Sequence, residues 1–419
     1  MVSPQHDPTG GAAPDEPVDI ALYGATGFVG GLLARYLAEH APPGVRIALA
    51  GRSEARLAAA RAALPGRARE WPLIVADAAD PAATDRLAAA ARVVLTTVGP
   101  YARYGLGLVE SCAKAGTHYA DLTGEVLFVR EAIDRFHAVA QASGARIVHS
   151  CGYDSVPSDL GVWLVHRAAE ADGSGGLTEV RTVATMRGGV SGGTIDSLRG
   201  QLDTVRGDRD ARRVAARPHS LSPDPSAEPT PSQPADAGPP ARLPDGTWTA
   251  PFVMASYNTR IVRRSNALLD HAYGRGLRYG ELQGCGRGPG GAVAAAAVTG
   301  GLGALVGAFM VPPLRPLLDR VLPAPGTGPS ERTRERGWFR MDVRAETGSG
   351  RRYRARVSGP GDPGYAATAV MLGEAGLALA LGGSALPDRA GCLTPATALG
   401  DVLVDRLRAA GHVYEVHAD

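Results

Sequence analysis

Three glycines, Gly24, Gly27 and Gly30, recur at intervals of three residues near the start of the chain. They follow the apolar run 20–23 and precede a helix-forming segment at 32–39. An apolar strand, a glycine-rich turn and a helix in this order are typical of a dinucleotide-binding βαβ unit, whose helix N-terminus offers free N–H groups to phosphates. We therefore expect a dinucleotide to bind at these glycines and at the neighbouring Thr26, Phe28 and Val29.

The end of the second expected strand, residues 45–50, indicates which dinucleotide binds. An NAD site usually has Asp or Glu there to hold the ribose hydroxyls, whereas this chain has Arg52 followed by Ser53. A guanidinium group forms paired charged hydrogen bonds with a phosphate, so we expect NADP(H). The alternative is that Arg52 is only a solvated residue. Asp77, after the third strand, is expected either beside the adenine or as a helix N-cap.

Candidates for the reaction follow the later strands. The fourth strand, 93–98, breaks into Gly99-Pro100, whose backbone would pass the nicotinamide, with Tyr101 and Tyr104 lining the cleft. Hydride transfer also needs a proton donor or a group that polarises an oxygen. Other candidates at strand ends are His118, Tyr119, Asp121, Tyr153, Asp154 and Ser155. We select Tyr101 and Asp154 first, then Tyr104. The alternatives are that the tyrosines only pack and that Asp154 only caps a helix.

The elements that would position these side chains alternate between strand and helix. Strands are expected at 20–23, 45–50, 73–76, 93–98, 118–121 and 146–150. Six strands alternating with helices predict an α/β Rossmann domain with a doubly wound parallel sheet. We place this domain at 18–170.

Composition limits the remaining classes of function. The chain has 419 residues, enough for two domains, and a net charge of +2, which gives no indication of nucleic-acid binding. The four cysteines lie far apart, so we expect no metal site or disulfide framework, and a cytoplasmic location. Residues 1–17 are polar and have no apolar core of the kind that a secretion signal needs, so we expect a disordered leader.

The second half predicts a second α+β domain at 171–360. A proline-rich insert at about 217–245 cannot build a core and is expected to be disordered. Residues 289–314 carry no charge and are long enough to span a bilayer, but they are mostly glycine and alanine. We favour a buried or mobile helix there, with peripheral membrane contact or a lid over an acyl chain as the alternative.

A small basic cluster, Arg260, Arg263 and Arg264, lies in the segment 258–270. We interpret it as a solvated helix face. The alternative is a surface for a phosphopantetheine arm or an acidic carrier protein.

Several motifs, taken together, resemble one known family. They are GATGFVG at 24–30, AGRS at 50–53, TTVGPYARYG at 96–105, THYADLTGE at 117–125 and CGYDSVPSDLG at 151–161. These segments are similar to the saccharopine dehydrogenase-like NADP-binding oxidoreductases, and most to their trans-acting enoyl reductase branch in lipid and polyketide biosynthesis. The resemblance continues through 192–198, 255–268 and 392–412. It implies a Rossmann domain, a second mixed domain, and C-terminal helices at 361–419 that return to the first domain.

The resemblance and Arg52 together predict an NADPH-dependent reductase of an α,β-unsaturated lipid or polyketide acyl thioester, supplied by a polyketide synthase or carrier protein. One alternative is an amino-acid C–N dehydrogenase of the saccharopine type, although the scarcity of lysine argues against a site for several carboxylates. Another is a non-catalytic NADP-binding protein at lipid surfaces, associated with the membrane rather than free in the cytoplasm. The chain has no S-x-x-x-Y-x-x-x-K pattern, so the short-chain dehydrogenase proton relay is not expected.

Overall fold

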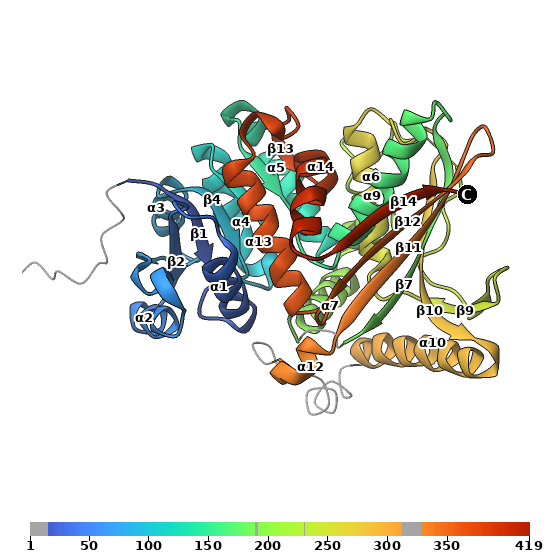
Figure 1. Ribbon diagram of the computed structural model, residues 1–419, viewed down its shortest axis with the longest axis horizontal. Coiled ribbons are helices and arrows are strands. Elements are labelled where there is room, and N and C mark those ends of the chain that lie inside the picture. The colour runs from blue at the N-terminus through green and yellow to red at the C-terminus, as the bar shows by residue number, and fades with distance from the viewer. Residues whose placement is uncertain (1–15, 189–191, 230, 312–327) are drawn as a thin grey trace, which may run out of the picture.

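The computed structural model describes residues 16–188, 192–229, 231–311 and 328–419. Across these residues the chain forms two sheets of seven strands each. Figure 1 shows the first sheet on the left, beneath helices from both ends of the chain, and the long strands of the second sheet on the right. The expected leader at 1–17 lies almost wholly outside the described residues.

The first sheet is parallel throughout, with the strand order β13-β6-β5-β4-β1-β2-β3. Its strands are β1 (Val18–Tyr23), β2 (Ile47–Gly51), β3 (Leu73–Val75), β4 (Ala91–Thr96), β5 (His118–Ala120), β6 (Arg146–Val148) and β13 (Gly391–Leu393). The order reverses between β1 and β4, which is where sheets of this kind bind ligands. The predicted doubly wound fold is confirmed, with a seventh strand that comes from the C-terminal segment and pairs with β6.

Helices connect these strands and cover the sheet. They are α1 (Phe28–His40), α2 (Glu54–Ala62), α3 (Pro81–Ala89), α4 (Tyr101–Ala115) and α5 (Val126–Ser143), with a 3₁₀ turn at Gly66–Glu70. Local sequence accounts for two of their starts, since the Ser53 side chain caps α2 and Asp80 caps α3 immediately before Pro81. Each strand therefore ends in a turn that leads directly into the next helix.

The second sheet has the order β14-β12-β11-β7-β10-β9-β8. Its strands are β7 (Leu177–Arg187), β8 (Ala241–Arg242), β9 (Thr247–Pro251), β10 (Arg278–Arg287), β11 (Trp338–Thr347), β12 (Arg352–Pro360) and β14 (Val413–Ala418). Two helices, α6 (Val156–Ala171) and α9 (Ala255–Leu268), lie against it. Gly161 of α6 sits directly over Val343 and Val357, where a Cβ atom would be 2.8 Å from the Val343 side chain. This contact holds the end of the Rossmann segment on the second sheet.

The C-terminal segment joins the two parts of the molecule. Helix α13 (Ala366–Leu381) packs on α1 through Gly373 against Tyr36, and on the first sheet through Gly376 against Leu95. Helix α14 (Pro395–Ala409) follows β13 and precedes β14. The segment expected to supply only helices to the first domain therefore also adds one strand to each sheet.

The described part of the proline-rich insert differs from the disordered segment expected at 217–245. Leu221 is fully buried, and Arg130 donates to the carbonyl oxygens of Ser220 and Ser222 at 3.1 and 3.0 Å. Proline has no N–H of its own, so a proline-rich chain has an excess of acceptors. Guanidinium groups from other elements supply the missing donors and hold the segment in place.

The basic cluster on α9 is neither a solvated face nor a docking surface. Arg260, Arg263 and Arg264 are only 4%, 3% and 1% exposed. Arg263 donates to the carbonyl of Tyr279 at 2.9 Å, and Arg264 donates to those of Leu221 and Cys392. Burial lowers the pKa of Arg263 and Arg264 to about 10. Both interpretations of the cluster were wrong, because the pattern of charges along a helix does not show what packs on it.

The described residues also form α7 (Gly192–Gly207), α8 (Arg209–Ala216), α10 (Gly288–Met310), which packs on β9 and β10, and the short α12 (Glu331–Glu335) before β11. Helix α10 was expected to be buried or mobile. Only 11% of its most apolar window is buried, so the expectation of a buried helix was wrong.

Candidate active site

A cavity of about 540 Å³ lies at the carboxyl ends of the first sheet. One wall consists of the turns that follow β1, β2, β3, β4 and β5. The opposite wall comes from Asp154, the N-terminal parts of α7 and α13, and the start of α9. Ligand-binding crevices in open α/β sheets have this position.

The glycine turn after β1 is shaped for close approach of a ligand to the backbone. Gly24 has a φ of +93°, and a Cβ atom on Gly30 would lie only 2.1 Å from the Gly24 carbonyl oxygen. Gly27 is the N-cap residue of α1 and lines the cavity, so the free N–H groups of this helix face it. Thr26, Phe28 and Val29 also line the cavity, as expected from the motif.

Two arginines lie at the outer end of this wall. Arg52 and Arg56 are exposed and line the cavity together with Asp77. Burial raises the pKa of the nearby Tyr23 to about 12, which Asp77 reinforces and Arg52 opposes. An exposed guanidinium pair beside a glycine turn has the donors that a 2′-phosphate requires. The residues present therefore fit NADP(H).

Two other predicted cofactor residues have local roles in the fold. Ser53 accepts a hydrogen bond from the Arg56 N–H at 3.4 Å as the cap of α2, and it is not among the cavity residues. Asp77 accepts from the Ala79 N–H at 3.0 Å, whereas Asp80 caps α3. Asp77 thus lies at the cavity and is not the N-cap.

The hydroxyl group of Tyr101, the first candidate for catalysis, is hydrogen-bonded inside the protein. The hydroxyl donates to the Thr96 carbonyl and accepts from the Leu122 N–H, both at 3.1 Å. Burial and the nearby Asp121 raise its pKa well above the usual value. The ring lines the cavity next to Gly99 and Pro100, but the hydroxyl joins the end of β4 to the loop after β5. This geometry disfavours Tyr101 as a proton donor.

Asp154 has the opposite character. Its side chain lines the cavity, and burial raises its pKa to about 7. Among the residues that the structure describes, none donates a hydrogen bond that would offset this shift. Ser155 is the N-cap residue of α6, so Asp154 does not cap the helix. Tyr104 also lines the cavity, half-buried, with the Arg103 guanidinium 5.1 Å from its ring centre.

Tyr257, at the start of α9, is a cavity residue that the sequence did not single out. It is 3% exposed, and its hydroxyl makes a short hydrogen bond with Ser150 Oγ. Burial raises its pKa well above the usual value, and Asp121 and Asp154 contribute to the shift. Its phenol therefore stays protonated near the carboxyl group of Asp154.

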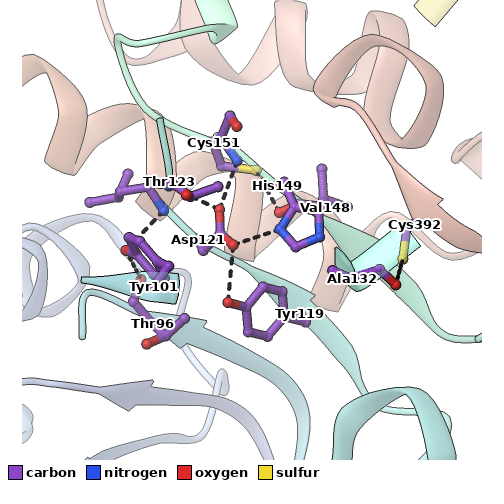
Figure 2. A network of polar contacts seen from close by, with 12 residues as sticks. Thr96, Tyr101, Tyr119, Asp121, Thr123, Ala132, Val148, His149, Cys151 and Cys392 are labelled. Carbon is purple, nitrogen blue, oxygen red and sulfur yellow. Dashed lines mark hydrogen bonds and ion pairs between the residues drawn. The ribbon is translucent and has the colours of Figure 1, made fainter. Parts of the chain in front are cut away.

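A buried network surrounds Asp121, the residue before the cavity residue Leu122 (Figure 2). The Asp121 carboxylate accepts from Tyr119 at 3.0 Å and from the Ser150 N–H at 2.8 Å, and pairs with His149 at 2.7 Å. Burial opposes the charged imidazole, but the Asp121 carboxylate raises the pKa of His149 to about 9. This network joins the ends of β5 and β6 and holds Ser150, the partner of Tyr257.

The other candidates at strand ends are not cavity residues. Their side chains pack or bond inside the protein: His118 accepts from the Arg146 N–H, Tyr153 packs against Met186 and Met341, and Ser155 donates to Asn258. Burial lowers the pKa of His118 to about 4. Position at a strand end was therefore not sufficient to place a side chain in the site.

Comparisons with known proteins bear on what this cavity does. A family model described as the saccharopine dehydrogenase NADP binding domain matches residues 20–148. A Mycobacterium tuberculosis protein, named provisionally as a trans-acting enoyl reductase, is 52% identical over 408 residues, 94% of this chain and 96% of its own. A Mycobacterium bovis protein named trans-acting enoyl reductase is 48% identical over 406 residues, with the same coverage. This chain belongs to the trans-acting enoyl reductase family.

The predicted resemblance is thus confirmed, and this trans-acting enoyl reductase family member is an NADP-dependent oxidoreductase. A solved structure of saccharopine dehydrogenase from Saccharomyces cerevisiae has the same fold, with a TM-score of 0.55 and 15% identity over 96% of this chain and 100% of that one. At that identity the likeness concerns the fold alone.

The second half of this chain contributes cavity residues that were not predicted from the sequence. Besides Tyr257, the cavity is lined by Asp196, Ser197, Leu198, Gln201, Val253, Met254 and Tyr365. Ser197 donates to Glu125 at 2.7 Å, and Glu125 in turn accepts from the Tyr101 and Ala102 N–H groups at the start of α4. The resemblance at 192–198 and 255–268 was the available signal for these residues, but it assigned no roles.

Proposed function

We propose that this protein reduces the double bond of an α,β-unsaturated acyl substrate, of lipid or polyketide type, with NADPH. The observation that carries the proposal is Asp154, a carboxyl group with a pKa of about 7 in the same cavity as the dinucleotide motif. Bound NADPH supplies a hydride to the β-carbon. Reduction of the double bond is complete only when the α-carbon also receives a proton, and a carboxyl group that is partly protonated at neutral pH can provide it.

Asp154 is the proposed proton donor, acting from its carboxyl oxygen on the α-carbon. Tyr257 is proposed to donate a hydrogen bond to the thioester oxygen, where negative charge develops before the proton arrives. Its neutral phenol and its bond to Ser150 suit it to this task. Tyr104 remains a candidate because it lines the same cavity, whereas the bonded hydroxyl of Tyr101 makes it a positioning residue.

The remaining walls suit an acyl chain. Leu122, Leu198, Val253 and Met254 give the cavity an apolar surface beside Asp154. The relatives are named as trans-acting, which suggests that the acyl chain comes from a separate polyketide synthase or its carrier protein. We include a membrane surface, contacted through α10, as a second partner.

The experiment is oxidation of NADPH by the purified protein with a panel of α,β-unsaturated acyl thioesters of increasing chain length. Saturated thioesters of the same lengths are the controls. Turnover with the unsaturated series alone is expected. Tight binding of NADPH with no turnover on any acyl thioester would instead favour a non-catalytic NADP-binding protein.

The amino-acid dehydrogenase alternative finds less support. It requires basic groups at the substrate for several carboxylates, and the cluster considered for that role, Arg260, Arg263 and Arg264, is buried on backbone carbonyls outside the cavity. The two arginines that line the cavity, Arg52 and Arg56, lie at the cofactor end. Saccharopine-type substrates in the same assay test this directly.

A further inference from the structure

Helix α10 presents apolar side chains to the solvent over its whole length. Its 23 residues carry no charge, and its most apolar window has a mean hydropathy of 1.9 with 11% of residues buried. Val293 is 70% exposed, and Val306 and Met310 are 40% and 43% exposed. A helix on the surface of a protein ordinarily has a polar outer face. This one has an apolar outer face, which is typical of a surface that is covered in use.

Only a narrow side of α10 packs against the rest of the protein, and contacts on this side fix both ends of the helix. Gly291 lies against Trp248 of β9, where a Cβ atom would be 3.3 Å from the indole, and Ala295 is fully buried. At the other end Phe309 is fully buried with the Arg199 guanidinium 5.4 Å from its ring centre, and Arg206 donates to the Met310 carbonyl at 3.3 Å. A helix held at both ends on one face of the protein lies along that face and does not cross a bilayer. Figure 1 shows it along the outer edge, beneath the ends of β7, β9 and β10.

The charges around α10 suit the headgroup region of a bilayer. Arg287 precedes its first residue, the exposed Arg206 donates to the carbonyl of its last residue, and the exposed Arg212 donates to the Arg206 carbonyl. Long arginine side chains can reach phosphate groups while the apolar helix enters the acyl boundary. Asp208 and Asp210 lie on the adjacent α8, so the attraction to anionic lipid is moderate and the apolar surface supplies most of the affinity.

Helix α7 connects this surface to the cavity. Its residues Ser197, Leu198 and Gln201 line the cavity, while the intervening Arg199 covers Phe309 of α10. One turn of helix therefore contacts both the site and the base of the apolar surface.

We propose that α10 lies flat in the interface of a phospholipid bilayer and holds the α7 side of the cavity at the membrane, where an acyl substrate would enter. The role in substrate entry rests on the proposed reductase function, whereas the binding of α10 to lipid does not.

The test is flotation of the full chain with phosphatidylcholine vesicles, with and without phosphatidylglycerol. We expect the protein to float with both, and somewhat more with the anionic mixture. Val293→Glu and Val306→Glu should each lower the partition coefficient roughly tenfold, since each removes a valine that the bilayer would bury and adds a charge. Leu381→Glu, at an apolar side chain on α13 that is 46% exposed, is the matched control and should float like the wild type. Equal NADPH binding by all variants excludes misfolding.

Two further measurements complete the test. If the helix lies flat, lipids brominated in the acyl chain should quench the fluorescence of the introduced tryptophan in both Val293→Trp and Val306→Trp. Quenching at only one of the two positions would overturn that orientation. A wild-type protein that does not float, or that sediments as a dimer dissociated by Val293→Glu, would overturn the proposal in favour of a contact between copies. Flotation without turnover on soluble acyl thioesters would refute the reductase function and leave lipid binding standing.

Discussion

The two walls of the cavity differ in how far apart their residues lie in the chain. The dinucleotide wall takes its glycine turn from one strand–turn–helix unit, Gly24 to Gly30. Its cations come from the next unit, with Arg52 directly after β2 and Arg56 in the first turn of α2. The opposite wall combines residues from four separate elements: Asp154 from the loop before α6, Ser197 from α7, Tyr257 from α9 and Tyr365 from the start of α13. The first wall is a local motif that can be recognised in the sequence, whereas the second wall forms only after the two sheets have packed.

The largest effect should come from the local motif itself. In Gly30→Ala the new Cβ would lie 2.1 Å from the Gly24 carbonyl oxygen, so the turn must open. Overpacking of this kind costs about 1–3 kcal/mol or more, and we expect NADPH binding to be lost at accessible concentrations. The control is Gly31→Ala on the same helix, where no atom lies within 4 Å. Its binding should be normal, as measured by fluorescence titration with NADPH.

The next effect tests the distant wall. Asp154→Asn should lower kcat by roughly 10²–10³ and leave NADPH affinity unchanged, because it removes the proton and keeps the shape. The wild-type rate should fall as pH rises through about 7, since only the protonated carboxyl group donates. Asp80→Asn, the same change at the cap of α3, should leave both quantities unchanged. A flat pH profile between 6 and 8 would argue against Asp154 as the donor.

A smaller effect is expected at the outer end of the dinucleotide wall. Arg52→Asp should weaken NADPH binding by roughly 10–100-fold and change NADH binding little, because a charged hydrogen bond contributes about 1.5–3 kcal/mol. Arg35→Asp on the exposed face of α1 makes the same change of charge and should alter neither. Equal losses for both cofactors would mean that Arg52 does not contact the 2′-phosphate.

The smallest effect separates Tyr101 from Tyr104. In Tyr101→Phe the Leu122 N–H and the Thr96 carbonyl lose their partner, so the free energy of unfolding should fall by about 1–2 kcal/mol. Tyr104→Phe keeps the ring beside Arg103 and should leave stability unchanged. Urea denaturation measures both. An unchanged stability in Tyr101→Phe, with a large loss of kcat, would return Tyr101 to the catalytic role.

Errors in the sequence-based interpretation share one cause. Arg264 looked like a solvated charge on a helix, and it is 1% exposed because the proline-rich segment and β13 supply carbonyl acceptors on either side. Residues 289–314 looked like a buried or mobile helix, and only 11% of the most apolar window of α10 is buried. Composition indicates in which environments a segment can be stable, whereas the burial of the segment depends on which other segments pack against it.

The sequence by itself determined the doubly wound sheet and the glycine turn at Gly24 to Gly30, and Arg52 led to the prediction of NADP. These features depend on period, local backbone conformation and charge at a strand end, all of which are encoded within a few tens of residues. Only the tertiary structure decided that the Tyr101 hydroxyl is bonded inside the protein, that Asp154 lies in a cavity that raises its pKa, and that Tyr257 joins it. Desolvation and hydrogen-bond partners are properties of the packed chain, because they arise from atoms of other segments that only packing brings close together.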